Sequence, residues 1–219
     1  GKTTVRSGVT GEIRLTTSRT VGVNAPVDVE MMSPTGAQVI MRVLDFGGVE
    51  SYRKSWATTY HQVHGALYVV DMSDTARLEE SGATLRGVLA HGYMKDKPVV
   101  IVGNKLDLVA GPEENVLASL PQRLGVESAV ASGACRVGGC VALAPKTADG
   151  HLDPRLRLNL DMLLQSIAMR KDTLEAQIET DSKEVAAAKA ARVEEQRKRV
   201  EKIKADRAAG IVAEKKKPA

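Results

Sequence analysis

Short apolar segments rich in β-branched residues recur along the first half of the chain, at residues 39–44, 65–70 and 98–103. Each is followed by or ends at Asp, Gly or Asn, which is typical of buried strands that stop at a loop. A weaker apolar segment at residues 25–32 precedes a Ser-Pro-Thr-Gly turn signal. We therefore predict an antiparallel hairpin over residues 25–44.

Segments of helical composition lie between and after these strands, at residues 75–91 and 113–123. Strands that alternate with helices indicate a mostly parallel sheet with helices on both faces, the α/β class. Beyond Asp153, large apolar residues recur at spacings of three and four: Leu156, Leu160, Leu163, Leu164 and Ile167. This spacing predicts the last helix of the domain.

Residues 171–209 contain no Pro or Gly and few large apolar residues, so we expect a long exposed helix that continues the last one. Ile178 and Val185 are seven residues apart, as are Val193 and Val200, but the step from Val185 to Val193 is eight. That step interrupts a regular coiled-coil seam. Self-association and a solvated or folded-back helix both remain open. We expect a domain over residues 1–169, this charged helix over 170–209 and a flexible basic tail over 210–219.

The chain has 219 residues with 43% hydrophobic content, enough for one α/β domain with an appendage. The net charge is +4, and much of the Lys and Arg follows Arg155, so the basic balance describes the tail and does not indicate nucleic-acid binding. Cys135 and Cys140 lack metal or redox spacing and are expected to be reduced thiols. No apolar run approaches the ~18 residues of a membrane span, and no signal peptide is recognised, so we expect a protein that faces the cytosol.

The first residues match the end of the phosphate-loop pattern GxxxxGK[ST]. Here Gly1 would offer backbone N–H groups to phosphates, Lys2 would reach the outer phosphates, Thr3 would ligate magnesium, and Thr4 follows in the same turn. The chain is therefore expected to begin inside the loop, after the first strand of the sheet. The tripeptide alone is equally compatible with chance or with a lysine-tipped loop.

Two further signals suit a phosphate and magnesium site. Asp45 closes an apolar strand, where its carboxylate can hold magnesium through water, and Gly48 is then free to bring its N–H to a γ-phosphate. Thr20 offers a hydroxyl that can join the magnesium shell when its loop is drawn inward. Taken alone, each has a plainer interpretation, as a strand-to-loop turn and as a polar loop threonine.

A fourth signal follows the strand at residues 98–103 directly: Asn104, Lys105, Leu106 and Asp107. The Asp107 carboxylate can accept two hydrogen bonds from the N1–H and exocyclic amine of guanine, a donor pair that adenine lacks. The alternative is a loop with an Asn cap. Four such signals in this order predict a switch that binds GTP or GDP with Mg²⁺.

The segments at residues 43–60 and 65–74 closely resemble the Arf and Arf-like GTPases, whose Arg-x-x-Trp-x-x-x-Tyr pattern is matched by Arg53, Trp56 and Tyr60. The resemblance extends from Gly1 to about Ile167. It implies a Ras-like small-GTPase fold, GTP/GDP switching and effectors that bind the switch regions. It also aligns residues 139–142 with a loop that covers the guanine, which would place Cys140 and Val141 at the nucleotide; Cys140 is equally well explained as a small buried residue.

Two departures narrow the resemblance. Val49 stands where most Arf-like proteins have the Gln that orients water, so intrinsic hydrolysis should be slow and no catalytic residue is certain. The ciliary branch of Arf-like protein 13 also lacks that Gln, and its long charged helix is similar to residues 186–207. Val23 also departs from the usual Phe on the effector-facing surface.

That branch implies a location at the cytoplasmic face of the cilium or flagellum membrane, with a lipid anchor ahead of Gly1 left open. It also implies that the GTP form acts as an exchange factor for Arf-like protein 3. The alternatives are an ordinary Arf-like GTPase of membrane trafficking, and a coiled-coil adaptor whose nucleotide site is inert.

Overall fold

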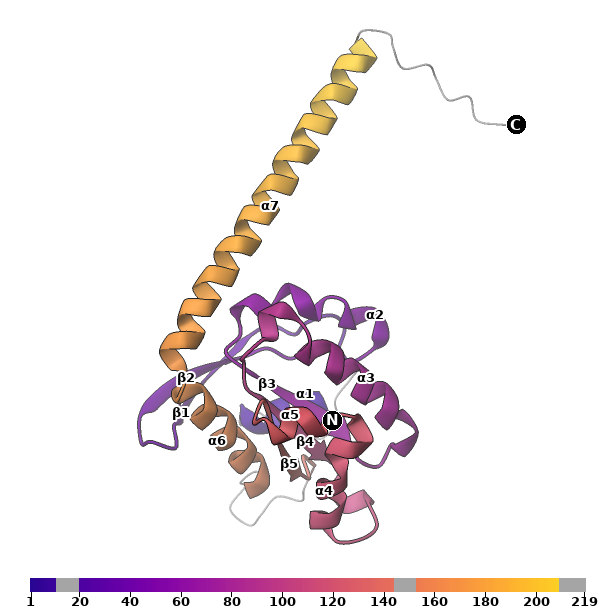
Figure 1. Cartoon of the computed structure of the whole chain (residues 1–219), viewed down its shortest axis with the longest axis vertical. Helices are drawn as coiled ribbons and strands as arrows, with labels where there is room; N and C mark the ends of the chain where they lie inside the picture. The colour runs from indigo at the N-terminus through magenta and orange to yellow at the C-terminus, as the bar shows by residue number, and fades with distance from the viewer. Residues whose placement is uncertain (11–19, 144–152, 209–219) are drawn as a thin grey trace, which may run out of the picture. The chain divides into compact units, whose positions relative to one another are not determined.

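The computed structural model describes residues 1–10, 20–143 and 153–208, and the chain divides into two compact units, Gly1–Ile178 and Glu179–Ala219 (Figure 1). The basic tail expected over residues 210–219 lies outside the described residues. The first unit holds the α/β domain. The second consists, in its described part, of a single helix.

The described strands of the first unit form two sheets. The hairpin of β1 (Val27–Met32) and β2 (Gln38–Val43) is antiparallel, with Val27 opposite Val43. A second sheet has the order β3-β4-β5 and is parallel throughout; it contains β3 (Ala66–Asp71), β4 (Val99–Asn104) and β5 (Cys135–Cys140). The hairpin, the two apolar strands and the parallel arrangement predicted from the sequence are confirmed.

β5 is a strand that the sequence pattern did not predict, because two of its six residues are glycines, which weaken a strand signal. Side chains of neighbouring elements lie so close to β5 that only glycine fits at these two positions. A Cβ at Gly138 would collide with the side chain of Asn159, and one at Gly139 would collide with Leu106. The strand is therefore stabilised by pairing with β4 and by close packing rather than by its own apolar side chains.

Helices cover both faces of the parallel sheet. Their bounds are α1 (Lys2–Val9), α2 (Glu50–Arg53), α3 (Leu78–Leu89), α4 (Glu113–Leu124), α5 (Glu127–Ala131), α6 (Pro154–Ala168) and α7 (Lys171–Ala208). Short 3₁₀ turns occur at η1 (Trp56–Thr58), η2 (Tyr60–Gln62), η3 (Thr75–Arg77), η4 (Gly92–Met94) and η5 (Leu106–Leu108). The segment predicted as one helix at residues 75–91 is thus η3 followed by α3.

The central strand β4 is buried on both faces, which explains its continuous apolar sequence. Val99 and Ile101 belong to one core cluster, together with apolar residues of α3 and α4. Val100 and Val102 belong to a second cluster, together with residues of α1 and α6. Two apolar layers therefore hold the strand ends of this sheet in fixed positions.

The last two helices are separate, although the sequence led us to expect that the long helix continues the previous one. Arg170 donates its backbone N–H to the carbonyl of Ile167 at 3.0 Å, a tight turn after α6, and its guanidinium donates to the carbonyl of Asp96 at 3.0 Å. Leu174, in the first turns of α7, is only 1% exposed. The beginning of α7 therefore packs into the first unit instead of lying in solvent.

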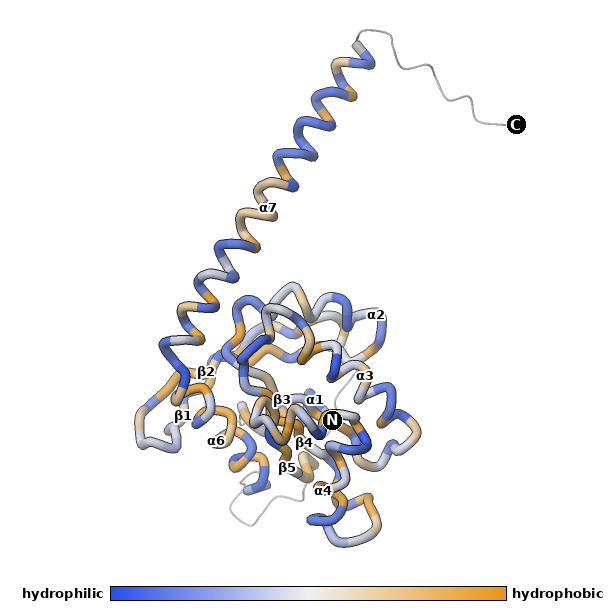
Figure 2. Tube along the Cα trace, viewed as in Figure 1, coloured by the Kyte–Doolittle hydropathy of each residue, from blue (hydrophilic) through white to orange (hydrophobic). Residues whose placement is uncertain are grey.

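Beyond Ile178, α7 is polar on most sides, with isolated apolar residues along its length (Figure 2). Its ion pairs in this described part join residues three or four apart, as between Glu179 and Lys183 at 2.6 Å. Within the ranges that the structure describes, no helix combines the length and the apolar character needed to cross a membrane.

Candidate functional site

The N-terminus of α1 lies beside the ends of β3 and β4. Val5 donates its backbone N–H to the carbonyl of Gly1 at 2.9 Å, which closes the first helical turn. A Cβ at Gly1 would lie 3.5 Å from the amide nitrogen of Asn104. The predicted phosphate loop and the predicted guanine motif, which are about a hundred residues apart in sequence, are therefore neighbours. The helix N-terminus carries no acidic residue in its first turn and so favours an anion there.

The three predicted magnesium ligands meet in one polar cluster. The Thr3 hydroxyl donates to a carboxylate oxygen of Asp45 at 3.0 Å and lies 3.0 Å from the Thr20 hydroxyl. Asp45 is only 5% exposed. Hydroxyl and carboxylate oxygens are the donors that magnesium prefers, so the residues present suit that ion.

Asn24 also belongs to this cluster, and the sequence analysis did not identify it. Its side-chain amide donates to Asp45 at 2.7 Å and to the Thr20 hydroxyl at 3.3 Å, and its backbone N–H donates to the carbonyl of Asp45 at 2.9 Å. Asn24 thus connects the candidate switch threonine to the end of β2. No short sequence motif marks it, because its partner is 21 residues away.

Lys2 approaches the backbone of Gly48 so closely that a Cβ at Gly48 would collide with the Lys2 ammonium. Burial lowers the pKa of Lys2 below its usual value; the nearby Asp45 carboxylate opposes this effect, and the cationic side chains of Arg53 and Arg77 add to it. No carboxylate of the described residues forms an ion pair with this partly desolvated ammonium, which is therefore well suited to a phosphate. Residue 48 must be a glycine, because a side chain there would occupy the position of the Lys2 ammonium.

The Gly47–Gly48 loop is held by two side chains that the sequence analysis used only as family landmarks. Trp56 donates its indole N–H to the carbonyl of Gly47 at 2.9 Å, and Arg53 donates to the carbonyl of Gly48 at 3.1 Å. Arg53 also bonds to Thr84 and Glu80 on α3. These contacts fix both carbonyls and so orient the loop. The next residue, Val49, is 40% exposed and carries no polar group on its side chain.

The predicted guanine motif begins at the end of β4. The buried side-chain oxygen of Asn104 accepts a hydrogen bond from the backbone N–H of Ala142 at 2.9 Å and one from the Cys140 thiol at 3.5 Å. Asn104 therefore positions the loop after β5. Asp107 lies exposed in η5, with its carboxylate open to solvent.

Lys105 adopts a left-handed backbone conformation with φ of 65°, and its ammonium pairs with Asp71 at the end of β3, at 2.5 Å. Partial burial acts to raise the pKa of Asp71, yet Lys105 and Ser73 together hold it below its usual value. The ion pair joins the ends of two adjacent strands. It fixes the position of the Lys105 ammonium relative to β3.

The residues predicted to cover the base have different environments. Cys140 is fully buried, and burial, with the Asp153 carboxylate, raises the pKa of its thiol to about 12. The side chain is therefore a neutral buried group, as the plainer interpretation had it. Val141 donates its backbone N–H to Asp153 at 2.6 Å. A contact of either residue with guanine stays a prediction.

Asp153 is a further residue that the sequence analysis did not assign to the site. It caps α6 by accepting the backbone N–H of Arg155 at 3.0 Å, and the Arg155 guanidinium bridges it to Glu113 at the start of α4. An Asp directly before Pro at a helix start is a recognisable N-cap signal. Its bond to Val141, by contrast, is visible only in the fold.

Residues 1–152 match the model of the ADP-ribosylation factor family. ADP-ribosylation factor-like protein 13B of Chlamydomonas reinhardtii is 32% identical over 186 residues, 84% of this chain and 33% of that protein. ADP-ribosylation factor-like protein 5 of Caenorhabditis elegans is 30% identical over 143 residues, 65% of this chain and 75% of that protein. The chain thus spans about a third of the length of the first relative.

Among solved structures, the Arl6 BBS3 small GTPase of Trypanosoma brucei with the bound nucleotide analogue GppNp is similar with a TM-score of 0.59. The match covers 81% of this chain and 92% of that one, at 22% sequence identity. At this identity the likeness shows a shared fold.

Proposed function

The chain belongs to the ADP-ribosylation factor family of GTP-binding small GTPases, and from this premise we propose that it is a magnesium-dependent GTP switch. It has the α/β Ras-like fold and the long C-terminal helix expected from its sequence. One observation carries the proposal. The side chains of Thr3, Thr20 and Asp45, from three separate segments, converge in one cluster, and the Asp45 carboxylate is close enough to Lys2 to act on its pKa.

In this proposal the phosphates bind at the N-terminus of α1. The backbone N–H groups of Gly1 to Thr4 and the Lys2 ammonium provide positive charge for them, and the N–H of Gly48 faces the γ-phosphate. The Thr3 and Thr20 hydroxyls would ligate Mg²⁺, and Asp45 would hold it through water. Magnesium, when bound, neutralises charge on the outer phosphates.

We assign guanine recognition to Asn104, Lys105 and Asp107. The exposed carboxylate of Asp107 accepts from the N1–H and amine of the base, while the stem of Lys105, held by Asp71, lies along the ring. Cys140 and Val141 are also assigned to the base site. The bond from Ala142 to Asn104 supports this assignment, because it fixes the loop next to the guanine motif.

We further propose slow intrinsic hydrolysis. The aliphatic side chain of Val49 cannot position a water molecule, so the site stabilises charge without aligning the nucleophile. Single-turnover measurements should show that Val49→Gln accelerates hydrolysis. A wild-type rate equal to that of the Val49→Gln variant would contradict this assignment and direct attention to the neighbouring Glu50.

The similarity to Arf-like protein 13B supports three finer proposals: a ciliary or flagellar location, attachment to the membrane through a lipid anchor, and exchange activity toward Arf-like protein 3. We also propose a functional boundary near Arg170, with the GTPase domain over residues 1–169, the charged helix over 170–209 and the tail over 210–219. Truncation after Ile178, which keeps the buried Leu174 in the first unit, tests whether the rest of α7 is needed for nucleotide release from Arf-like protein 3.

The decisive experiment exchanges the base specificity. Asp107→Asn presents a donor where guanine requires an acceptor, so the variant should prefer xanthosine triphosphate over GTP by at least about tenfold, or roughly 1.4 kcal/mol. Competition binding with the 219-residue chain measures this preference. Asp172→Asn, an exposed change of the same kind, should leave it at the wild-type value. An unchanged preference in Asp107→Asn would refute the base assignment.

Space at the phosphate loop can be tested separately. Gly48→Ala would force Lys2 away from its position, so GTP affinity should fall about a hundredfold, or roughly 2.7 kcal/mol. Gly87→Ala is the matched control, because a Cβ there meets no atom within 4 Å. Equal GTP affinity in both variants would contradict the role given to Lys2 and Gly48.

A further inference from the structure

An apolar stripe runs along α7 through Ile178, Val185, Val193 and Val200. Its steps of seven, eight and seven residues break a heptad repeat, but they fit an eleven-residue repeat of about 3.67 residues per turn. The stripe therefore stays on one face of the helix. The order of the steps is the same in both directions, so the stripe is symmetric about Lys189.

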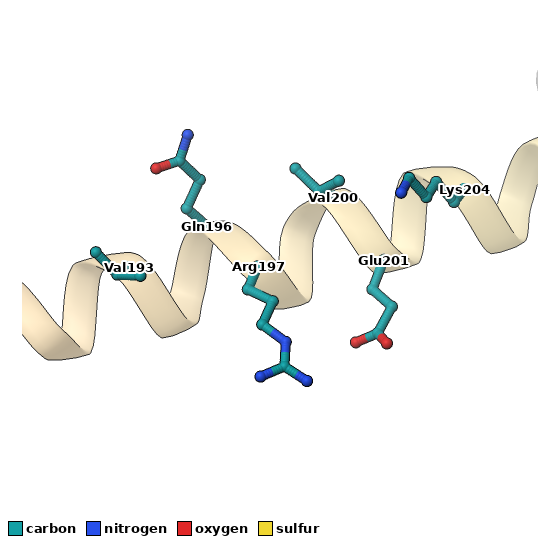
Figure 3. A pocket seen from close by; sticks show the side chains of 6 residues that line it. All are labelled: Val193, Gln196, Arg197, Val200, Glu201 and Lys204. Carbon is teal, nitrogen blue, oxygen red and sulfur yellow. The ribbon is translucent and has the colours of Figure 1, made fainter.

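The second half of this stripe is exposed, whereas Ile178 and Val185 in its first half are only partly exposed. Val193 is 60% exposed and Val200 is 44% exposed, whereas Leu174, nearer the start of the helix, is buried in the first unit. A depression lined by residues between Val193 and Lys204 covers only the second half of the stripe, and Figure 3 shows Val193, Gln196 and Val200 projecting from one side of the helix. Because one helix alone lines this depression, it is an open contact surface and does not enclose a ligand.

The charges beside the stripe are opposite in its two halves. Residues 179–184 contain three acidic and one basic side chain, and residues 192–199 contain four basic and two acidic ones. Between them lies an alanine-rich segment, residues 186–191, interrupted only by Lys189. Small side chains at the middle of a helix allow another helix to approach closely.

We propose that α7 pairs antiparallel with α7 of a second copy of this chain, over Ile178 to Val200, with the two-fold axis at Lys189. An antiparallel arrangement places Ile178 opposite Val200 of the second copy and Val185 opposite Val193. Because the spacing is symmetric, all four apolar positions are matched at once. The inference depends on α7 alone and is independent of the proposed nucleotide site.

The flanking charges select this orientation. At a helical period of 3.6 residues, Glu179 and Arg197 lie on the same flank of the stripe, and Asp181 and Arg199 lie on the other. A two-fold axis at Lys189 brings Glu179 close to Arg197 of the second copy, and Asp181 close to Arg199 of the second copy. A parallel pair would instead place Glu179 beside Asp181 and Arg197 beside Arg199, which is repulsive.

Two features of α7 oppose this pairing and lower the stability of the dimer. Within α7, Lys183 pairs with Glu179 at 2.6 Å and Arg197 with Glu194 at 3.9 Å, but these side chains are more than half exposed, so such pairs exchange at little cost. The two copies of Lys189 meet at the axis, and a lysine at a core position reduces stability. Lys189→Leu should therefore tighten the dimer.

Cysteine cross-linking distinguishes the orientations. Ser182 and Gln196 are equidistant from Lys189, so they face each other only in the antiparallel pair. Under mild oxidation, a mixture of Ser182→Cys and Gln196→Cys chains should form a disulfide between the two variants. Each variant by itself should form few disulfide-linked dimers. The wild-type chain is the control, since burial raises the pKa of Cys135 to about 11 and that of Cys140, with a contribution from Asp153, to about 12. Cross-linking of each variant with itself would overturn the antiparallel pairing.

Sedimentation equilibrium of the 219-residue chain over a concentration series measures the association itself. Glu179→Arg and Arg197→Glu should each weaken the dimer roughly fivefold, because each changes two symmetric pairs, and the double variant should restore it. Lys202→Glu, a similar charge reversal on the opposite side of the helix, should have little effect. A chain that stays monomeric at every concentration, or a dimer that ignores these reversals, would overturn the proposal.

Discussion

The two units of the chain use similar charged residues in different ways. In the first unit, ion pairs and hydrogen bonds join distant segments, as between Arg155 and Glu113, 42 residues apart, or Thr3 and Asp45, also 42 residues apart. In the described part of the second unit, the ion pairs join residues three or four apart on α7. Within the described residues, the first unit therefore positions key polar groups through contacts between distant segments, whereas the ion pairs named on α7 follow the periodicity of the helix.

This difference explains where specific chemistry can arise. Asp45 can serve as a ligand because β2 and the core hold it at 5% exposure beside two hydroxyls. Glu179 and Arg197 have no comparable support, and their charges act through their pattern along a surface. We infer that the first unit binds a small ligand, whereas the second is suited to a long, extended partner.

The largest expected effect concerns α7, whose beginning is buried in the first unit and whose remainder forms the second unit. Leu174→Ala removes a buried side chain and should lower the free energy of unfolding of the first unit by about 3 kcal/mol. Leu158→Ala, at a position that is 61% exposed, and Val193→Ala, on the second unit, should each cost less than about 0.5 kcal/mol. Urea denaturation of dilute protein measures all three. Equal losses in the free energy of unfolding for the three variants would contradict the distinction between the buried beginning of α7 and its exposed remainder.

A smaller effect is expected where two helices of the first unit touch. A Cβ at Gly82 would lie 2.5 Å from the carbonyl oxygen of Leu124 on α4, so Gly82→Ala should cost about 2 kcal/mol through overpacking. Gly87→Ala, in the same helix but facing open space, should be neutral or slightly stabilising. If thermal unfolding shows no difference between the variants, α3 and α4 are packed less closely than the structure indicates.

Next in size is the capping network at Asp153. Asp153→Ala removes the N-cap of α6 and the partner of Val141, and should cost about 1–2 kcal/mol at neutral pH. GTP affinity should fall as well, because the loop after β5 loses its anchor. Chemical denaturation and nucleotide binding measure the two effects.

The same network predicts a pH dependence. Burial acts to raise the pKa of Asp153, but Arg155 and the backbone N–H groups of Val141 and Arg155 hold it below its usual value. The folded-state pKa is therefore lower than the unfolded one, so the stabilisation is present above the unfolded pKa and is lost as pH falls through the folded pKa. The difference in the free energy of unfolding between wild type and Asp153→Ala should decrease as the pH is lowered. A difference that does not change with pH would show that the charge of Asp153 plays no part.

The smallest effect belongs to the second unit. Lys183→Gln removes the ion pair with Glu179 while nearly preserving helix propensity, and should cost only about 0.3 kcal/mol. Hydrogen exchange of the α7 amides near residue 183 measures it, and added salt should abolish the difference. A cost above about 1 kcal/mol would mean that this part of α7 has tertiary contacts of its own.

The sequence by itself determined the elements and motifs whose signals are local. The apolar segments that became β2, β3 and β4, the turn between β1 and β2, and the leucine spacing of α6 each depend on neighbouring residues, so their interpretation was correct. The motifs at Lys2, Asp45 and Asn104 were recognised for the same reason. Their order along the chain predicted a switch that binds guanine nucleotides, and the segments at residues 43–60 and 65–74 indicated the Arf family.

Tertiary structure alone decided the features whose causes lie far away in the chain. Gly138 and Gly139 form a strand because β4 pairs with them and Asn159 and Leu106 occupy the space beside them. Asn24 joins the polar cluster through a partner 21 residues away, and Leu174 is buried only because the chain turns after α6. Local sequence specifies propensity, but such contacts exist only once the chain has folded and brought distant segments together.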